Sequence, residues 1–372
     1  MIVVYNTDQI YKHGGIEKVM ATKANYLVQQ PNYEVYIVTA EQESRPACYP
    51  LLESIALVDL GINYDRSKSY WSIRNMLKAV KHFWRQYKYY QKLQPDVVIS
   101  PNYNFDHYWL PFLLPKKTKL LKELHSSRFY EGAQRQKRGL KNSLFWKLQD
   151  WIESKYDKVI VLNADEESYR PGTNVVIIPN PVEPSTAKAP LTSKKVIAAG
   201  RLAPVKGFDH LIEAWQLVHA KFPAWQLHIY GDDYGGTQQV LQKRIIALQL
   251  ENTIQLRASV PNFVQTMLDY SIFALSSETE CFPTVLLEAL SVGLPLVSYD
   301  CPNGPRHIIN HNQDGILVAK RKPEKLALAL MTLMQDEEKR KVFGTHAQIN
   351  SASFHTETIM HRWINLLNDL LV

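Results

Sequence analysis

The chain has 372 residues, of which 45% are hydrophobic and 21% charged, and its formal net charge is +7. This composition excludes a disordered or fibrous protein, and the length is enough for two domains that each bury a core. No apolar run approaches the roughly 18–20 residues that a membrane-spanning helix needs, and the three cysteines have no metal-binding spacing.

Short runs rich in β-branched residues alternate with longer amphipathic runs in the first half of the chain. This alternation predicts parallel strands, buried on both faces and connected by helices. We expect strands at 2–6, 33–39, 55–59, 96–100, 118–123, 158–162 and 175–178. A segment at about 180–194 is rich in Pro, Ser, Thr and Lys and has no periodicity, so we expect it to be a linker.

The same alternation then restarts and continues through the second half. We expect strands at 195–199, 226–230, 253–257, 271–275, 295–299 and 315–318, and a final amphipathic helix at about 354–372. Two successive sets of parallel strands predict an α/β protein with two doubly wound, Rossmann-like domains. Ligands are expected beyond the C-terminal ends of the strands.

Three features of the first half lie at such strand ends. Gly14 and Gly15 stand between the first strand and a helix expected to open at Ile16, where glycine permits close backbone approach to a ligand. His125 follows the strand at 118–123, and Asn102 and Asn104 follow the strand at 96–100. Each could equally be a structural residue, so these positions are candidates only in combination with other signals.

Residues 64–92 interleave Lys and Arg with Trp, Tyr and Phe, and Asp65 is the only acid among them. Nucleic-acid binding would suit such a stretch, but the pattern contains no base-reading fold, so we expect no nucleic-acid partner. A basic, aromatic-rich helix fits the headgroup region of an anionic membrane. The alternative is an aromatic core face with a solvated basic side.

The second half contains two stretches that suit a nucleotide ligand. In the segment AAGRLAPVKGFDHLIEAW (198–215), a strand ends at Gly200 and a loop then carries Arg201 and Lys206. Two cations at a strand end suit a diphosphate. The alternative is a solvated basic loop.

The other stretch is SETECFPTVLLEALSVGLP (277–295), a turn followed by a helix that should end at Gly293. The free N–H groups at the helix start favour a phosphate. Glu280 lies on the turn, and Glu288 lies among apolar residues of the helix, where a carboxylate needs donors such as sugar hydroxyls. We expect Glu278 to be a solvated turn residue.

The stretch ECFPTVLLE resembles the E-x7-E motif of the retaining, nucleotide-sugar-dependent glycosyltransferases of family 4. The GR…K segment (200–206), LHIYGD (227–232) and GLPLVSYDCPNGPRHII (293–309) strengthen the resemblance, which is strong over 195–320 and looser over 1–25. It implies the GT-B fold. An acceptor-side domain at 1–183 would be joined by the helix at about 354–372, and 184–353 would bind the donor.

The resemblance also implies roles for individual residues. Glu280 would contact donor-sugar hydroxyls and Glu288 the ribose, while Arg201 and Lys206 would neutralise the diphosphate. His125 would touch the sugar or the acceptor. The other implied donor-binding residues are Gly14, Gly15, Gly200, Gly231, Phe282, Pro283, Thr284 and Val285. Cys281 and Pro283 depart from the pattern because glycines are common at these two positions.

The implied function is retaining transfer of a hexose or N-acetylhexosamine, as in surface-polysaccharide or glycolipid assembly. The donor would be a UDP-linked or other nucleotide diphosphate sugar, and the acceptor a glycan or a polyprenyl- or other lipid-linked molecule. No cofactor or metal is expected, since no Asp-x-Asp motif occurs. A glycosidase, a nucleotide-sugar epimerase and a non-catalytic sugar-nucleotide-binding protein remain alternatives. We expect a cytoplasmic protein, peripheral on the inner face of the membrane.

Overall fold

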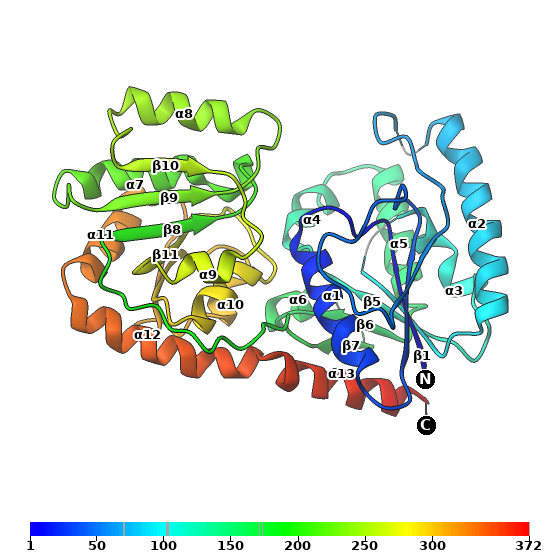
Figure 1. The fold of residues 1–372 in the computed structure, drawn as a ribbon. Helices are drawn as coiled ribbons and strands as arrows, with labels where there is room; N and C mark the ends of the chain where they lie inside the picture. Colours follow the sequence, from blue (N-terminus) through cyan, green and yellow to red (C-terminus); the bar gives the residue numbers. More distant parts are fainter. Residues whose placement is uncertain (70, 102–103, 171, 173, 372) are drawn as a thin grey trace. The chain divides into compact units, whose positions relative to one another are not determined.

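The computed structural model describes residues 1–69, 71–101, 104–170, 172 and 174–371. The chain forms two compact units. Unit 1 consists of Met1–Pro181 with Ile359–Val372, and unit 2 consists of Val182–Thr358. Each unit contains one parallel sheet with helices on both faces (Figure 1), which confirms the predicted α/β class.

The described part of unit 1 holds a seven-stranded sheet in the order β3-β2-β1-β4-β5-β6-β7, with every pairing parallel. Each predicted strand of this half is present, with ends that differ by about one residue. The strands are β1 (Ile2–Thr7), β2 (Glu34–Thr39), β3 (Ala56–Asp59), β4 (Val97–Ser100), β5 (Lys119–Glu123), β6 (Lys158–Val161) and β7 (Val175–Ile177).

Helices cover both faces of this sheet. Val3 of β1 belongs to one core and Val4 to the other, as the two-residue period of a strand requires. The first core is completed by α1 (Gly15–Val28) and α13 (Thr356–Leu371), and the second by α2 (Ile73–Leu93), α3 (Leu110–Leu113) and α5 (Leu140–Glu153). Unit 1 also contains η1 (Phe105–Tyr108), α4 (Phe129–Arg135) and α6 (Ala164–Ser168).

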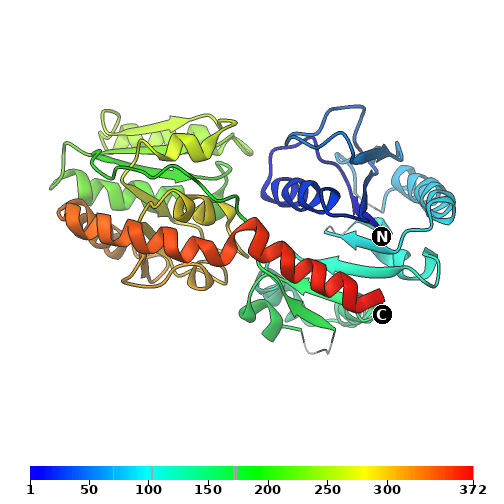
Figure 2. The same cartoon turned by 60° about the horizontal axis from the view of Figure 1, so that its bottom comes forward.

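The C-terminal helix α13 returns to unit 1, as predicted (Figure 2). Its side chains Ile359, Met360, Trp363 and Leu367 are buried in the same core as Val3 and the α1 residue Leu27. Burial of an apolar side chain of this size contributes about 1.5–3 kcal/mol. The burial of these side chains therefore holds α13 on unit 1.

Unit 2 holds a six-stranded sheet in the order β10-β9-β8-β11-β12-β13, again all parallel. The strands are β8 (Lys195–Ala199), β9 (Gln226–Tyr230), β10 (Ile254–Arg257), β11 (Ile272–Leu275), β12 (Leu296–Tyr299) and β13 (Gly315–Val318). The helices are η2 (Pro204–Lys206), α7 (Phe208–His219), α8 (Thr237–Ala247), α9 (Phe263–Met267), α10 (Thr284–Ser291), η3 (Pro305–His307), α11 (Pro323–Met334), α12 (Glu337–Ser351) and η4 (Ala352–Phe354).

The strand order of each sheet contains a reversal. In unit 2 the chain moves outward from β8 through β9 to β10 and then returns to the other side of β8 at β11. In unit 1 the same reversal separates β1 from β4. Ligands of open α/β sheets bind beyond the carboxyl ends of the strands at such points. A ligand of unit 2 is therefore expected beside the loops that follow β8 and β11.

Candidate active site

The loops after β8 and β9 approach so closely that only glycine fits between them. A Cβ atom on Gly231 would lie 1.9 Å from the carbonyl oxygen of Gly200, and Gly200 has a φ of +154° that disfavours other residues. The N–H of Gly200 donates to the carbonyl of Tyr230 at 3.0 Å. Two of the predicted donor-binding glycines thus lie in direct contact.

The loop after β8 also positions the two predicted cations. Lys206 ends the short helix η2, and Gly207 follows it with a φ of +59°. A Cβ on Gly207 would lie 2.2 Å from the carbonyl oxygen of Ser276, so this turn packs directly on the end of β11. The guanidinium of Arg201 is exposed and lies 5.4 Å from the centre of the Tyr234 ring.

The turn after β11 brings Glu280 against Lys206. Nζ of Lys206 donates to Oε1 of Glu280 at 2.6 Å, and the hydroxyl of Ser277 donates to the same oxygen at 2.7 Å. The two charged side chains are 20% and 12% exposed, so solvent still reaches both. A cation and a carboxylate that follow different strands therefore meet at the β8–β11 reversal.

The segment after β12 holds this turn from the other side. The N–H of Glu280 donates to the carbonyl of Pro302 at 2.8 Å, and the N–H of Asn303 donates back to the carbonyl of Glu280 at 2.6 Å. A Cβ on Gly304 would lie 2.7 Å from Cδ of Pro283. The buried ring of Phe282 packs on Phe354, with 5.7 Å between ring centres. The turn is thus fixed by backbone pairing and close packing.

Helix α10 begins directly after this turn, with Pro283 as its N-cap residue. Leu286 donates its N–H to the carbonyl of Pro283 at 3.1 Å, so the N–H groups of Thr284 and Val285 lie before this bond, at the positive end of the helix. Glu288 is buried one turn further on. The helix ends at Ser291 with Val292 as its C-cap residue, and Gly293 follows with a φ of +72°, close to the predicted end.

The prediction that Glu278 is a solvated turn residue was wrong. Nε of Arg321 donates to its Oε2 at 2.7 Å, and Nδ1 of His210 lies 3.5 Å from its Oε1. Its own N–H donates to the carbonyl of Val205, so the residue ties the turn after β11 to the loop after β8. Arg321 lies 43 residues further along the chain, which is why the local sequence gave no sign of this pairing.

The remaining predicted site residues lie in unit 1. Gly14 is the N-cap residue of α1 and has extended backbone angles that any residue can adopt, while Gly15 is the first residue of the helix, one position earlier than expected. His125 follows β5, and its Nε2 lies 3.3 Å from Oε1 of Glu123. Asn104 donates to Oδ1 of Asp8 at 2.6 Å, and Asn102 lies outside the described residues.

Sequence reasoning missed an ionic cluster at the β1–β4 reversal of unit 1. Arg66 binds Oδ2 of Asp8 at 2.9 Å and both carboxylate oxygens of Glu41 at 3.0 and 2.8 Å. Burial raises the pKa of Asp8 to about 6, and Arg66 opposes this shift. The available signal was the place of Asp8 directly after the first strand, where the parallel-sheet rule expects ligands.

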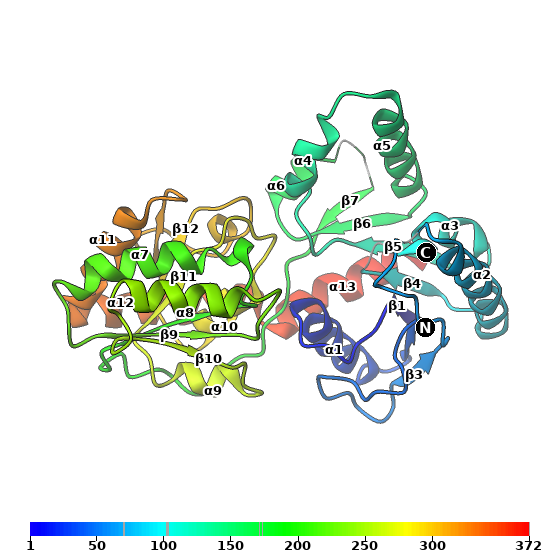
Figure 3. The same ribbon diagram turned by 90° about the horizontal axis from the view of Figure 1, so that it is seen from above.

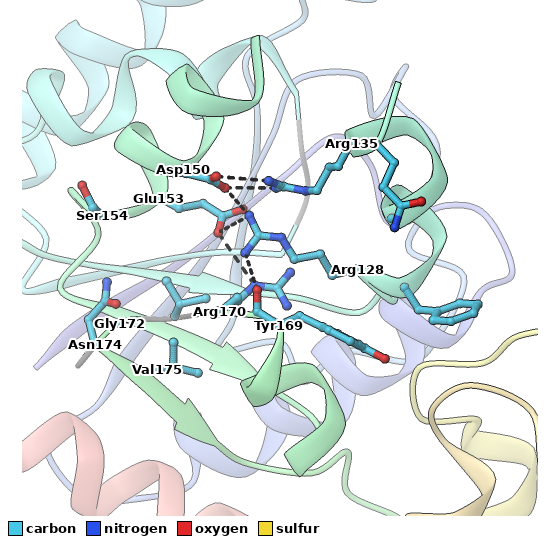
Figure 4. A pocket seen from close by; sticks show the side chains of 14 residues that line it. Arg128, Arg135, Asp150, Glu153, Ser154, Tyr169, Arg170, Gly172, Asn174 and Val175 are labelled. Atoms are coloured by element: carbon cyan, nitrogen blue, oxygen red, sulfur yellow. Dashed lines mark hydrogen bonds and ion pairs between the residues drawn. The ribbon is translucent and has the colours of Figure 1, made fainter. Parts of the chain in front are cut away.

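Unit 1 also contains a cavity of about 750 Å³ between α4, α5, β6 and β7 (Figure 4). Arg128 and Arg135 both bind Asp150, and Arg170 lies 3.7 Å from Glu153 and 3.1 Å from Glu166. Carboxylates therefore balance the arginines that line this cavity. None of the predicted donor-binding residues belongs to its lining.

Two family models match the chain and together cover most of it. The model described as "Glycosyltransferase Family 4" matches residues 13–186, and the model described as "Glycosyl transferases group 1" matches residues 182–349. The boundary between the two matches falls where unit 1 passes into unit 2.

Individual proteins show the same likeness. The chain is 25% identical over 378 aligned positions to the amylovoran biosynthesis glycosyltransferase AmsD of Erwinia amylovora, covering 97% of this chain and 98% of that protein. It is 33% identical over 229 residues to an exopolysaccharide phosphotransferase of Streptomyces coelicolor, where the match covers 60% of this chain and only 22% of that protein.

Among solved structures, the crystal structure of HepE from Anabaena in complex with UDP and glucose has a TM-score of 0.76 to this chain. It is 19% identical and covers 98% of this chain and 99% of that chain. At this level of identity the likeness shows a shared fold.

Proposed function

We propose that this chain, a glycosyltransferase that belongs to family 4 and has the GT-B fold, moves a hexose or N-acetylhexosamine from a nucleotide diphosphate sugar with retention of configuration. The observation that carries the proposal is the contact of Lys206 with Glu280 at the β8–β11 reversal. Cationic, anionic and helix-terminal groups gather there beyond the strand ends, and each suits a different part of one donor.

The leaving group of such a reaction is a nucleotide diphosphate, which carries negative charge. Lys206 and Arg201 would neutralise this charge as the bond to the sugar breaks, and the N–H groups at the start of α10 would donate to the same phosphates. Glu280 would accept hydrogen bonds from sugar hydroxyls and Glu288 from the ribose.

Retention requires the new bond to form on the face that the leaving group vacates. The C1–O bond to the β-phosphate breaks with both electrons leaving on the phosphate oxygen, and the acceptor oxygen then bonds to C1 on that face. The β-phosphate oxygen takes the proton of the acceptor hydroxyl. The protein supplies cations and dipoles for this step, so we expect activity to persist when divalent metals are chelated.

The complex of HepE with UDP and glucose supports a uridine base for the donor. The acceptor is proposed to be a glycan or a lipid-linked glycan. This agrees with the name of the relative AmsD, which is a glycosyltransferase of amylovoran biosynthesis. A glycosidase is disfavoured, because its two carboxylates flank one bond from opposite sides, whereas Glu280 and Glu288 belong to one turn-helix unit.

A calorimetric binding screen tests the donor. We expect UDP and at least one UDP-sugar to bind the intact chain, and Glu288→Gln to weaken both. Turnover of a bound nucleotide sugar without any acceptor would favour an epimerase. Binding of UDP-sugar without transfer to any glycan or lipid extract would favour a non-catalytic binding protein.

The structure also supports a membrane location for the acceptor. None of the helices in the described part of the chain is long and apolar enough to cross a membrane. Helix α2 is seen in Figure 3 on the outside of unit 1. It exposes one apolar stripe and carries Lys and Arg without a single acid. The stripe consists of Ile73, Leu77, Val80 and Trp84, each more than half exposed.

Helix α5 packs on the same side of the sheet as α2 and also exposes apolar side chains. It exposes Leu144, Leu148 and Trp151, and the exposed ring of Phe112 in α3 stacks on Trp151 with 5.6 Å between ring centres. We propose that this face, named here the α2–α5 face, docks on an anionic lipid surface, where each Lys or Arg contributes about 1 kcal/mol. The buried residues Ala79 and Tyr90 show that the opposite side of α2 supplies the core contacts.

Flotation with anionic vesicles at low salt tests this location. We expect the chain to float, and a variant with Ile73→Ser, Leu77→Ser and Trp84→Ser to remain in the bottom fraction. Val240→Ser and Ile349→Ser replace equally exposed apolar residues of unit 2 and should float like the parent. Failure of the parent chain to float would overturn the membrane proposal and leave the glycosyl transfer untouched.

A further inference from the structure

We propose that Lys23 and Glu123 are positioning residues that hold the imidazole of His125 in one orientation and one tautomer. The inference rests on the proposed function in one respect, because it takes His125 to contact the donor sugar or the acceptor. The three residues come from α1, the end of β5 and the loop that follows β5.

The contacts form a short chain of charges. Nζ of Lys23 lies 2.5 Å from both carboxylate oxygens of Glu123, and Oε1 of Glu123 lies 3.3 Å from Nε2 of His125. The side chains of Lys23 and Glu123 are 1% and 3% exposed. One carboxylate is thus shared between a lysine on one side and the imidazole on the other.

Aromatic rings enclose the lysine end of this chain. Nζ of Lys23 lies 4.3 Å from the centre of the Trp363 ring and 5.6 Å from that of Tyr5. Trp363 belongs to α13, the C-terminal helix, which packs in unit 1. These rings keep water from the ammonium group and stabilise its charge through their faces.

The charge of Glu123 decides which nitrogen of His125 carries hydrogen. Burial alone would raise the pKa of Glu123, but Lys23 and His125 lower it to about 2. Burial lowers the pKa of Lys23, and Glu123 opposes that shift. An ionised carboxylate accepts hydrogen bonds and cannot donate one, so this contact favours hydrogen on Nε2 of His125. In a neutral ring Nδ1 is then the acceptor and is available for a hydroxyl.

A purely structural role would not require this arrangement. A buried ion pair is often replaced by apolar residues of similar volume with no loss of stability. Because this ion pair contacts a candidate site residue, the orientation of His125 is the property that the charges add.

The double variant Lys23→Met/Glu123→Leu distinguishes a purely structural role of the ion pair from a role in orienting His125. We expect it to keep its Tm and its affinity for UDP, while kcat falls on the order of 100-fold and by no more than in His125→Ala. The surface variant Lys221→Met/Glu251→Leu makes the same chemical change at exposed positions and should keep its kcat. A folded double variant with parental kcat would overturn the inference.

The tautomer of His125 gives a second readout that needs neither donor nor acceptor. In ¹⁵N spectra of the intact chain we expect neutral His125 to carry hydrogen on Nε2, and the double variant to show a mixture of tautomers. Hydrogen on Nδ1 in the parent would overturn the inference and leave the proposed function intact. The expected tautomer in a chain that transfers no sugar would instead overturn the proposed function. If the double variant does not fold, Lys23→Met/Glu123→Gln takes its place with the same outcomes.

Discussion

Nζ of Lys206 lies 2.6 Å from Oε1 of Glu280, so a cation assigned to the donor diphosphate and a carboxylate assigned to the donor sugar already form an ion pair. Both side chains retain some exposure. Partly exposed pairs stabilise a fold weakly, by about 1 kcal/mol or less. Donor binding can therefore redistribute these contacts at small cost, and the pair keeps both groups in place beforehand.

Replacing Lys206 with Met should separate catalysis from stability. Without the cation the departing diphosphate loses a preorganised charge, so we expect kcat to fall by about 10²–10³-fold. The melting temperature should change less than kcat, because solvent still reaches both side chains and Ser277 still donates to the carboxylate of Glu280. Steady-state kinetics and thermal unfolding check both effects, and Lys206→Arg should recover part of the activity. A kcat within a few-fold of the parent would contradict the assignment.

Replacing each of the two carboxylates of the E-x7-E motif should change the affinities for UDP and for UDP-sugar differently. Hydrogen bonds to a charged group contribute about 1.5–3 kcal/mol, so Glu288→Gln should weaken UDP binding by roughly 10–150-fold. Glu280→Gln should leave UDP binding unchanged, because UDP lacks the sugar that Glu280 contacts, yet it should weaken binding of the intact donor. Calorimetric titration with UDP and with UDP-sugar gives all four affinities. Equal losses for UDP in both variants would show that the roles are wrongly divided.

Gly304→Ala isolates the effect of a single methyl group on the turn at Glu280. Gly304 has a φ of −68°, which alanine adopts freely, but its Cβ would lie 2.7 Å from Pro283 and 2.8 Å from the carbonyl oxygen of Cys281. We expect a displaced turn, a loss of donor affinity and a destabilisation of about 1–3 kcal/mol.

Gly132→Ala is the matched control for this substitution, because Gly132 lies in α4 with open space around it. Alanine there should stabilise the protein by about 0.5–1 kcal/mol and leave donor binding unchanged. Chemical denaturation measures both variants. Unimpaired donor binding in Gly304→Ala would show that the turn tolerates movement.

Unit 2 should lose stability in mild acid because of His228. Burial lowers the pKa of this residue to about 4, with Arg257 and Lys195 adding to the shift. Between its ordinary value near 6.5 and about 4, the unfolded chain binds a proton that the folded chain does not, so stability falls as the pH falls. The denaturation midpoint of His228→Gln should therefore change less between about pH 7 and about pH 5 than that of the parent. An unchanged slope would contradict this origin.

The sequence predicted the strands well and the charge partners poorly, for a physical reason. Strands such as β8 and β12 are buried on both faces, so their apolar runs reveal them locally, and the stripe of apolar residues similarly revealed α13. The partners of Glu123 and Glu278 lie 100 and 43 residues away, and only the folded chain brings them together. The roles of Arg201, Lys206, Glu280 and Glu288 stay predictions until a donor is bound.

Product analysis tests the central claim most directly. The chain is incubated with the UDP-sugar that it binds and with a lipid or glycan extract, while NMR follows the anomeric proton and chromatography follows UDP. The account predicts UDP release in step with a new glycosidic bond that has the anomeric configuration of the donor, and loss of both in Lys206→Met. An inverted product, or cleavage of a nitrophenyl glycoside in the absence of nucleotide, would contradict it.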